Sequence, residues 1–437
     1  MKVKLDYGRN GLVVDLPDHS RIVTPRHQQG LPDEASAIRE ALRHPIGSPP
    51  LALLVKPGDK VVVSHTDITR ATPNSRILPI LLDELESVGI ASSDITLLNA
   101  IGTHRRQTSG ELRQMLGDRV VDHYRCVQHD GNGDAGLISM GRTSFGHPVR
   151  VNRLFVESDV RILTGFIEPH FFAGFSGGPK GVMPALAGSE SVSSNHGYSM
   201  LAHPRATWGT TIGNPVWEEM REVALLAKPT FLLNVTLNRQ HQITGVFAGD
   251  LVEAHRVGCE FCRESVMVPV EAPFDIVVTT NSGYPLDQNL YQSTKGISGG
   301  NQILRDGGAI IIATACEEGL PGHGGYAAIL REGGSPEGVL QMIGRPGFRM
   351  QDQWNAQIQA MVQLRADVFV YSDGLTDEQI RQALLRPCRD IEDTVAALQS
   401  RFGQDARICV LPEGPQTIAY IDPAIRASDP KKRGRLE

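Results

Sequence analysis

The sequence is poor in cysteine and in aromatic residues, and it has no long apolar run. Six cysteines in 437 residues do not make a disulfide framework. An aromatic content of 5% and a formal net charge of −6 argue against a general nucleic-acid-binding protein. No apolar run reaches the ~18 residues needed to span a bilayer, and Met1 to Asp6 form no apolar signal-peptide core. We therefore expect a cytoplasmic protein that binds neither nucleic acid nor membranes.

Two of the cysteines, Cys259 and Cys262, form a CxxC pair. The pair lies in a helical pattern that begins near residue 251, and no second cysteine pair stands at zinc-ribbon spacing. A redox or zinc site is the alternative, but the pattern favours a structural helix face. Of the 14 histidines, no two have HxxxH or HExxH spacing, so a zinc hydrolase has little support.

The chain is long enough for two or three domains with full cores. From about residue 58, short apolar runs alternate with helical patterns, which predicts a parallel or mixed sheet covered by helices. Residues 1–50 contain several prolines and are expected to form short strands and turns. The expected strands are 60–64, 95–98, 120–126 and 160–164, and the expected helices are 75–88, with Asn74 as its N-cap, and one that begins with the capping box of Thr108 and Glu111.

A second α/β unit is predicted after residues 267–273, whose Pro269 and Pro273 favour an extended linker. Its expected elements are a helix within 288–305 and strands at 274–280, 309–313, 368–371 and 408–411. The predicted fold class is therefore α/β, with two domains that are each a mixed sheet covered by helices, and with the active site in the cleft between them. The predicted domains are 1–270 and a smaller one at 271–437, whose last ~30 residues return to the first domain.

Three polar loops follow expected strands of the first domain, at 65–70, 102–105 and 168–181. Ligands of α/β folds bind at the carboxyl ends of strands, so we expect these loops to converge on one site. The third loop is rich in glycine, which lets the backbone approach a bulky anion closely. It is not a Walker A loop, because Pro179 precedes Lys180 and Gly181 follows it. The same spacing also fits a tight structural turn with a surface lysine.

Histidines and cations in these segments are the candidate functional side chains. His104, His170 and His196 offer acid/base or metal-ligand chemistry. The alternative for each is a hydrogen-bonded structural histidine or, for His196, a cap of a helix or turn. Arg70 and Lys295 suit a small carboxylate substrate, with solvated surface charge as the alternative.

The motifs, in this order, resemble the nickel-pincer nucleotide-dependent lactate racemases and their relatives among the 2-hydroxy acid racemases and epimerases. Each motif is weak alone, but the ordered set is specific, and the similarity runs nearly end to end. Pro179 stands where some members of the family have arginine, which removes a contact to the cofactor phosphate. The segments that carry the resemblance are 46–51, 55–61, 67–70, 102–104, 168–170, 174–180, 195–196 and 292–296.

The resemblance implies a role for each matching position. Lys180 carries the cofactor covalently, through a thioamide or related thiocarboxylate linkage. The cofactor is a pyridinium mononucleotide that holds nickel through sulfur, carbon and sulfur, and His196 completes a near-square-planar nickel site. His104 and His170 are the two acid/base residues. The implied substrate contacts are Arg70, Tyr291, Gln292, Lys295 and Trp354, and the implied cofactor contacts, besides Lys180, are Asp67, Thr69, Ser176, Gly177 and Gly178.

The reaction implied by the resemblance is the racemisation of a 2-hydroxy acid by reversible hydride transfer to the cofactor. The Cα–H bond is not acidic, so hydride transfer avoids a hard proton abstraction. Each enantiomer presents its hydroxyl differently, which requires two bases. Aromatic residues such as Phe171 and Phe172 favour lactate and other short aliphatic substrates, with phenyllactate or a sugar-acid 2-epimerase as alternatives. The implied partners are the cofactor-synthesis enzymes, and the distant alternative is a non-enzymatic module that binds a phosphorylated ligand.

Overall fold

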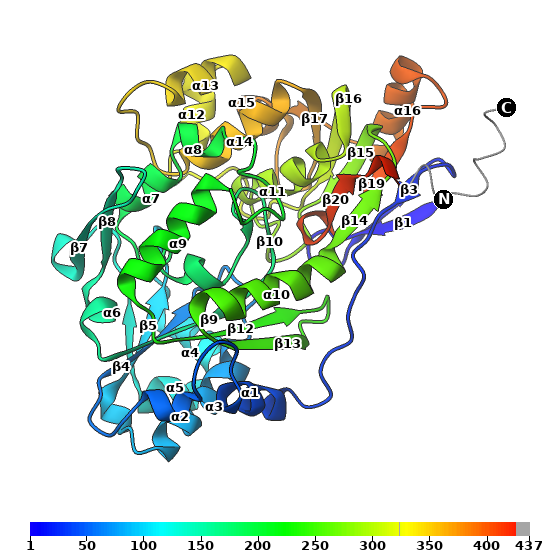
Figure 1. Cartoon of the computed structure of the whole chain (residues 1–437). Helices are drawn as coiled ribbons and strands as arrows, with labels where there is room; N and C mark the ends of the chain where they lie inside the picture. The colour runs from blue at the N-terminus through cyan, green and yellow to red at the C-terminus, as the bar shows by residue number, and fades with distance from the viewer. Residues whose placement is uncertain (323, 425–437) are drawn as a thin grey trace.

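The first of two large sheets has six strands in the order β13-β12-β9-β4-β5-β6. It is seen in a computed structural model that describes residues 1–322 and 324–424. All its neighbours run parallel except β13, which pairs antiparallel with β12. In Figure 1 this sheet lies in the lower half of the molecule. In the sheet order above, the strands span Ile243–Gly249, Phe231–Leu237, Val160–Phe166, Val61–Thr66, Ile95–Ala100 and Arg125–Gln128.

Helices cover both faces of this sheet, because its central strands are apolar on both sides. Val61 and Val63 pack with leucines of α3 (Asn74–Ser87) and with α1 (Glu34–Arg43). Val62, which points the other way, packs in the core that contains α9 (Pro215–Ala227) and α10 (Leu251–Val266). The sheet is therefore the centre of a three-layer unit, and its carboxyl edge is left for loops.

The second sheet is parallel throughout and has the order β18-β17-β16-β15-β19-β3. One face packs against α11 (Leu290–Asn301), α13 (Pro336–Ile343) and α14 (Gln353–Gln363), and the other against α16 (Ile391–Phe402) and the hairpin of β1 (Lys2–Leu5) and β2 (Leu12–Asp15). The predicted α/β class with helix-covered sheets is confirmed. The strands, in sheet order, span Arg386–Pro387, Ala366–Tyr371, Leu304–Ala313, Phe274–Thr280, Ile408–Leu411 and Arg21–Ile22.

The two ends of the chain are arranged differently from the predicted domain limits. The strand β3 pairs with β19, and the N-terminus lies beside the second sheet in Figure 1, although residues 1–270 were expected in one domain. Of the last ~30 residues, β19 belongs to the second sheet, and β20 (Ile418–Ile421) pairs with β14 (Met267–Val270) in the expected linker. Residues 425–437 lie outside the described part.

Three local predictions were wrong. Residues 120–126 were expected as a strand, but α5 (Asp118–His123) precedes β6, because the buried side chains Val120 and Tyr124 are four apart, as in a helix. The helix α1 was missed among the expected strands and turns. Asn74 does not cap α3: it is the first helical residue, and its buried side chain donates to the carbonyl of Thr66.

The CxxC cysteines occupy the buried side of α10, as the helix-face interpretation predicted. Burial raises the pKa of both thiols, that of Cys262 to about 12. All six cysteines are free, and the described residues contain no cluster of three or more His, Cys, Asp or Glu that could hold a metal ion. None of the described helices is both long and apolar enough to cross a bilayer.

Candidate active site

One cavity of about 140 Å³ between the two sheets collects nearly every residue predicted to be functional. Its lining from the first sheet comes from the loops after β4, β5 and β9, and its lining from the second unit comes from α11 and α14. Thr69 is the exception, because it lines a neighbouring cavity instead. The predicted residues that line the first cavity are Asp67, Arg70, His104, His170, Ser176, Gly177, Gly178, Lys180, His196, Tyr291, Gln292, Lys295 and Trp354.

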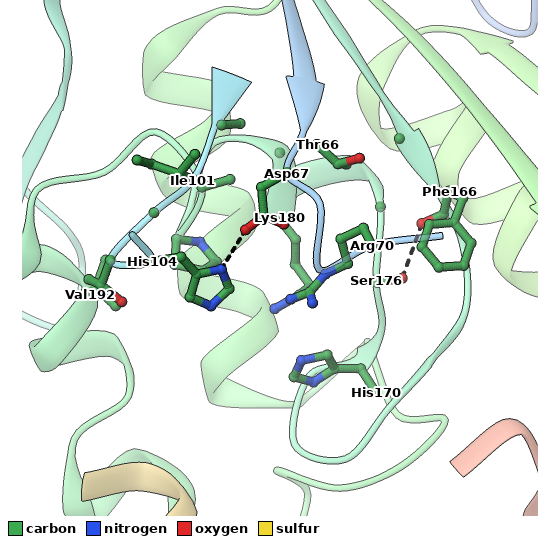
Figure 2. A pocket seen from close by; sticks show the side chains of 18 of the residues that line it. Thr66, Asp67, Arg70, Ile101, His104, Phe166, His170, Ser176, Lys180 and Val192 are labelled. Carbon is green, nitrogen blue, oxygen red and sulfur yellow. Dashed lines mark hydrogen bonds and ion pairs between the residues drawn. The ribbon is translucent and has the colours of Figure 1, made fainter. Parts of the chain in front are cut away.

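Asp67 and His104 are joined by a hydrogen bond across the ends of β4 and β5, drawn as a dashed line in Figure 2. The Oδ2 of Asp67 lies 2.6 Å from Nδ1 of His104. Burial would raise the pKa of Asp67, but the charge and hydrogen bond of His104 outweigh it and lower this pKa to about 2. Asp67 is therefore ionised at neutral pH and orients the imidazole, and it also lines the cavity, where its cofactor contact stays a prediction.

Thr69 and Arg70 extend this pair along the same loop. The Thr69 hydroxyl donates to Oδ1 of Asp67 at 2.7 Å. The Arg70 guanidinium donates to the carbonyl and the hydroxyl oxygen of Thr69, at 3.2 and 3.1 Å. Thr69 thus supports Asp67 and Arg70, while the guanidinium of Arg70 lines the cavity itself (Figure 2).

Because Asp67 sets the orientation of His104, the substitution Asp67→Asn is expected to lower kcat by about 10- to 100-fold. The amide offers an N–H where the carboxylate accepts, so the imidazole loses its preferred tautomer. KM is expected to stay nearly unchanged, because Asp67 itself is paired with His104. Steady-state kinetics in both directions would check this. An unchanged kcat would contradict the orienting role.

His170 lies in a short hairpin formed by β10 (Pro169–His170) and β11 (Gly174–Phe175). The ring is buried, packs against Phe171 and Phe172, and accepts a hydrogen bond at Nδ1 from the N–H of Ala173 (3.3 Å). Burial, together with the charges of Lys180, Lys295 and other cations, lowers its pKa well below the ordinary value. His170 is therefore neutral at physiological pH.

Lys180 lies in the short 3-10 turn Gly178–Gly181 and is buried. Burial and the charges of Arg70 and Lys295 lower the pKa of its amine to about 7, against a weaker opposing effect of Glu168. Its Nζ lies 5.7 Å from the centroid of the Phe172 ring. A large fraction of this amine is unprotonated near neutral pH, so it is available as a nucleophile.

The buried amine is expected to cost stability, so Lys180→Met should raise the Tm of the cofactor-free protein by about 2–4 °C at pH 6. Between pH 7 and 10.5 the unfolded state binds the proton and the folded state does not, so wild-type stability rises with pH across this window. The gain from methionine should therefore be largest below pH 7 and shrink toward pH 10.

Thermal unfolding at pH 6 and pH 9 measures this difference. The exposed Lys56 provides the matched control, since Lys56→Met should leave the Tm unchanged. A lower Tm for Lys180→Met at pH 6 would show that the buried amine does not destabilise the fold.

His196 ends α7 (Ser189–Asn195) as its C-cap residue, and its ring lies inside the cavity wall. It packs edge-on against Phe172 and Trp354, with ring centroids 4.9 and 5.2 Å apart. Its Nδ1 is buried without a hydrogen-bond partner among the described residues. Burial and the charge of Lys180 lower its pKa to about 3. A neutral imidazole with an unsatisfied nitrogen is the form that binds a metal ion.

The second unit contributes the opposite wall through α11 and α14. Trp354 donates from Nε1 to the Tyr291 hydroxyl at 2.9 Å, and burial raises the pKa of that hydroxyl. Burial and the charge of Arg70 lower the pKa of Lys295 to about 8. Gln292 lines the same wall. Arg70 and Lys295 therefore place two cations at the meeting point of the two units.

Two buried residues near the glycine-rich loop escaped the sequence analysis. Asn234 in β12 accepts at Oδ1 from the N–H of Gly178 at 2.7 Å. His255 in α10 lies with Nε2 2.9 Å from the carbonyl of Ser176. The Ser176 hydroxyl donates to the carbonyl of Phe166 (Figure 2), while Ser176 also lines the cavity and its cofactor contact stays a prediction. The polar Asn234 after the apolar run Phe231–Leu233 was the one available sequence signal.

Two family models match the chain. The lactate racemase N-terminal domain matches residues 7–209, and the lactate racemase C-terminal domain matches residues 270–419. A lactate racemase from Thermoanaerobacterium thermosaccharolyticum is 35% identical over 422 residues, which cover 95% of this chain and 98% of that protein. The chain belongs to the lactate racemase family. The resemblance predicted from the motifs is thereby confirmed.

Further comparisons agree with this family assignment. A lactate racemase from Lactiplantibacillus plantarum is 35% identical, over 87% of this chain and 90% of that protein. The lactate racemase apoprotein from T. thermosaccharolyticum superposes with a TM-score of 0.89 at 34% identity, covering 96% of this chain and all of that one. A Thermotoga maritima protein shares the fold, with a TM-score of 0.69 at 21% identity over 90% of this chain and all of that one.

The cavity of this family member suits a cofactor that brings its own metal donors. His196 offers one unsatisfied imidazole nitrogen, and the described residues form no cluster of three or more metal-ligating side chains. These residues therefore offer a metal ion at His196 fewer than three such protein ligands, and a cofactor with its own donors would complete the site. The amine of Lys180, whose pKa is lowered to about 7, lines the same cavity and can attach such a group covalently.

Proposed function

We propose that this member of the lactate racemase family racemises lactate-like, short-chain aliphatic 2-hydroxy acids by reversible hydride transfer to a nickel-pincer nucleotide attached to Lys180. The proposal rests on one observation. In a single cavity, the Nδ1 of His104 donates a hydrogen bond and the Nδ1 of His170 accepts one, and the same cavity is lined by the buried amine of Lys180 and by His196, whose Nδ1 has no hydrogen-bond partner among the described residues. The names of the relatives support the substrate, since both curated proteins are lactate racemases.

Lys180 and His196 would hold the cofactor, through a covalent bond at Nζ and a nickel–imidazole bond respectively. When bound, the group supplies an electrophilic pyridinium carbon that accepts and returns a hydride, which the protein side chains cannot do. Both residues are buried, and their surroundings lower the pKa of Lys180 to about 7 and that of His196 to about 3. Each therefore reaches at neutral pH the unprotonated form that the attachment requires. Lys180 must lose its proton to form the bond, and His196 must be neutral to ligate nickel.

His104 and His170 are proposed to exchange the hydroxyl proton of the two enantiomers. Asp67 accepts from Nδ1 of His104, so the neutral ring leaves Nε2 free to accept a proton. Ala173 donates to Nδ1 of His170, so the neutral ring carries its proton on Nε2 and presents this N–H to the substrate oxygen. His104 is thus set to take the hydroxyl proton of one enantiomer, and His170 returns a proton to the oxygen of its mirror image after it has taken one from solvent and become an imidazolium.

Arg70, Gln292 and Lys295 are proposed to hold the substrate carboxylate and its neighbouring oxygen. A guanidinium matches the bidentate geometry of a carboxylate, and the buried surroundings strengthen the attraction. Two cations also retain the planar 2-keto acid while it turns within the site. The lowered pKa of Lys295, about 8, leaves it mostly protonated at pH 7 and therefore able to serve as a cation.

Aromatic side chains line the space left for the substrate side chain. Phe171 and Phe172 lie beside His170, and the Tyr291 hydroxyl already accepts from Trp354, so this wall offers mainly apolar surface. An apolar wall favours a methyl or ethyl group over the carboxylate of malate or the hydroxyls of a sugar acid. Phenyllactate and sugar-acid epimerisation are the alternatives that a substrate panel separates.

Protein produced together with the cofactor-synthesis enzymes tests this function. We expect a covalent mass increase on Lys180, bound nickel, and racemisation of lactate and 2-hydroxybutyrate faster than of phenyllactate, malate or gluconate in a chiral assay. If the adduct on Lys180 forms but another substrate is racemised faster, only the proposed substrate specificity changes. The absence of both adduct and nickel, with reversible binding of a free nucleotide, would replace the enzyme by a phosphate-ligand binding module.

A further inference from the structure

Buried side chains of two other elements form hydrogen bonds with the glycine-rich loop Ser176–Gly178, which precedes Lys180. Asn234 reaches it from β12, and His255 reaches it from α10. Both side chains are about 1% exposed. Neither residue belongs to the motifs that carry the family resemblance, and they lie 56 and 79 residues from their loop partners in the chain.

His255 holds the loop through the carbonyl of Ser176. Burial lowers the pKa of His255 to about 4, so its ring is neutral. The carbonyl can only accept, so the proton of the ring lies on Nε2 and is donated across 2.9 Å. The ring also lies nearly parallel to Trp217, with an interplanar angle of 15°, and Cys259 contacts it one turn further along α10. The donor atom is therefore fixed in place.

Asn234 holds the loop through the backbone N–H of Gly178, two residues after Ser176. Its Oδ1 accepts from the N–H of Gly178 at 2.7 Å, and its own amide donates to the carbonyl of Leu233 at 3.1 Å. The second contact fixes which way the carboxamide faces. Because β12 lies inside the sheet, between β13 and β9, this acceptor moves only if the sheet does.

The glycines of the loop are explained by these two side chains. A Cβ on Gly177 would lie 2.5 Å from Oδ1 of Asn234, and a Cβ on Gly178 would lie 2.4 Å from the ring of His255. Both glycines also have a positive φ, +74° and +51°. The turn then closes when the N–H of Lys180 donates to the carbonyl of Gly177 at 3.1 Å. The position of the Lys180 backbone thus follows from the hydrogen bonds that hold Ser176 and Gly178.

We propose that Asn234 and His255 are positioning residues that clamp the loop Ser176–Gly178 and so hold the Lys180 amine at a fixed depth in the cavity. This inference rests on the proposed role of Lys180 as the cofactor anchor. The clamp acts before any group is attached, because it is formed entirely by the protein. It supplies the rigid support that an attachment site requires.

The clamp is tested on the full-length cofactor-free chain by measuring how fast an amine reagent modifies Lys180 as a function of pH, read by peptide mass spectrometry. The wild-type profile should have its midpoint near pH 7, as burial of the amine requires. In His255→Leu the loop loosens, water reaches the amine, and the midpoint should rise by about one pH unit. In His255→Gln the amide N–H replaces Nε2 and the wild-type midpoint should return.

Val266→Ala is the matched control, because this buried residue lies on the last turn of α10, about 16 Å along the helix from His255. It should lower the Tm without moving the midpoint. If His255→Leu does not fold, His255→Asn replaces it, since the shorter amide cannot reach the Ser176 carbonyl. A folded Leu or Asn variant that keeps the wild-type midpoint overturns the clamp, as does a shift that glutamine fails to reverse.

The same measurement separates failure of the clamp from failure of the proposed function. The modification profile needs no cofactor, so a displaced midpoint in His255→Leu supports the clamp even if no adduct ever forms on Lys180. Conversely, an unchanged midpoint together with normal cofactor loading removes the clamp and leaves the proposed racemase intact.

Discussion

Replacing either His104 or His170 with glutamine is expected to lower racemisation by about 10³-fold or more while cofactor loading on Lys180 stays intact. Glutamine keeps hydrogen-bonding groups near the ring positions but cannot exchange a proton, and general acid–base catalysis contributes about 10²–10⁴-fold. Both histidines are needed in each direction, because the hydroxyl proton leaves on one side and returns on the other. Each single variant should therefore lose both directions of the reaction.

A chiral assay started from each enantiomer, combined with intact-mass analysis of the same samples, measures these two properties together. The exposed His44 serves as the control, and His44→Gln should retain wild-type rates and loading. Normal turnover in both active-site variants would refute the two-histidine assignment. Loss of the adduct in either variant would show that the histidine supports attachment rather than proton transfer.

Replacing Lys180 with arginine is expected to abolish the covalent adduct, the bound nickel and all racemisation. The guanidinium remains protonated at any accessible pH and cannot act as a nucleophile. The lysine amine, by contrast, has a pKa of about 7 and is largely neutral at pH 8. The charge at this position is retained at low pH, so a loss of loading reports on the missing amine.

Lys295→Arg is the matched control for this substitution, because it makes the same exchange at another lysine of the same cavity. It should keep the adduct on Lys180 and raise KM, since Lys295 is proposed to bind the substrate carboxylate. Intact mass, nickel content and kinetics distinguish the two variants. An adduct of the expected mass on the Lys180→Arg protein would show that the cofactor is attached to a residue other than Lys180.

Much of the sheet framework follows from short apolar runs. The predicted runs at 60–64, 95–98 and 160–164 lie in the adjacent parallel strands β4, β5 and β9, which are buried on both faces and therefore rich in apolar residues. The capping box at Thr108 is present because it depends only on contacts within one helical turn. Features that depend on neighbouring residues were the ones that sequence patterns predicted correctly.

The failures occurred where a pattern had two solutions or where distant parts of the chain decide. Residues 120–126 combine β-branched residues with buried positions four apart, and packing selected the helix. The strand β3 was expected to belong to the first domain, yet its partner β19 lies almost 400 residues further along the chain. The helix α1 had a readable signal that the surrounding prolines obscured: Asp33 is its N-cap and accepts from the N–H of Ser36, and Ile38 and Leu42 are buried on one face.

By itself the sequence determined the fold class, the family and most of the predicted side chains that line the cavity. Parallel strands place their carboxyl ends at one edge, so residues that follow different strands meet there whatever the details of packing. Only the tertiary structure decided what each side chain contacts: Asp67 pairs with His104, Thr69 lines a neighbouring cavity, and Asn234 and His255 hold the glycine-rich loop. These contacts join residues far apart in the chain, and their geometry depends on how whole elements pack, which no local pattern encodes.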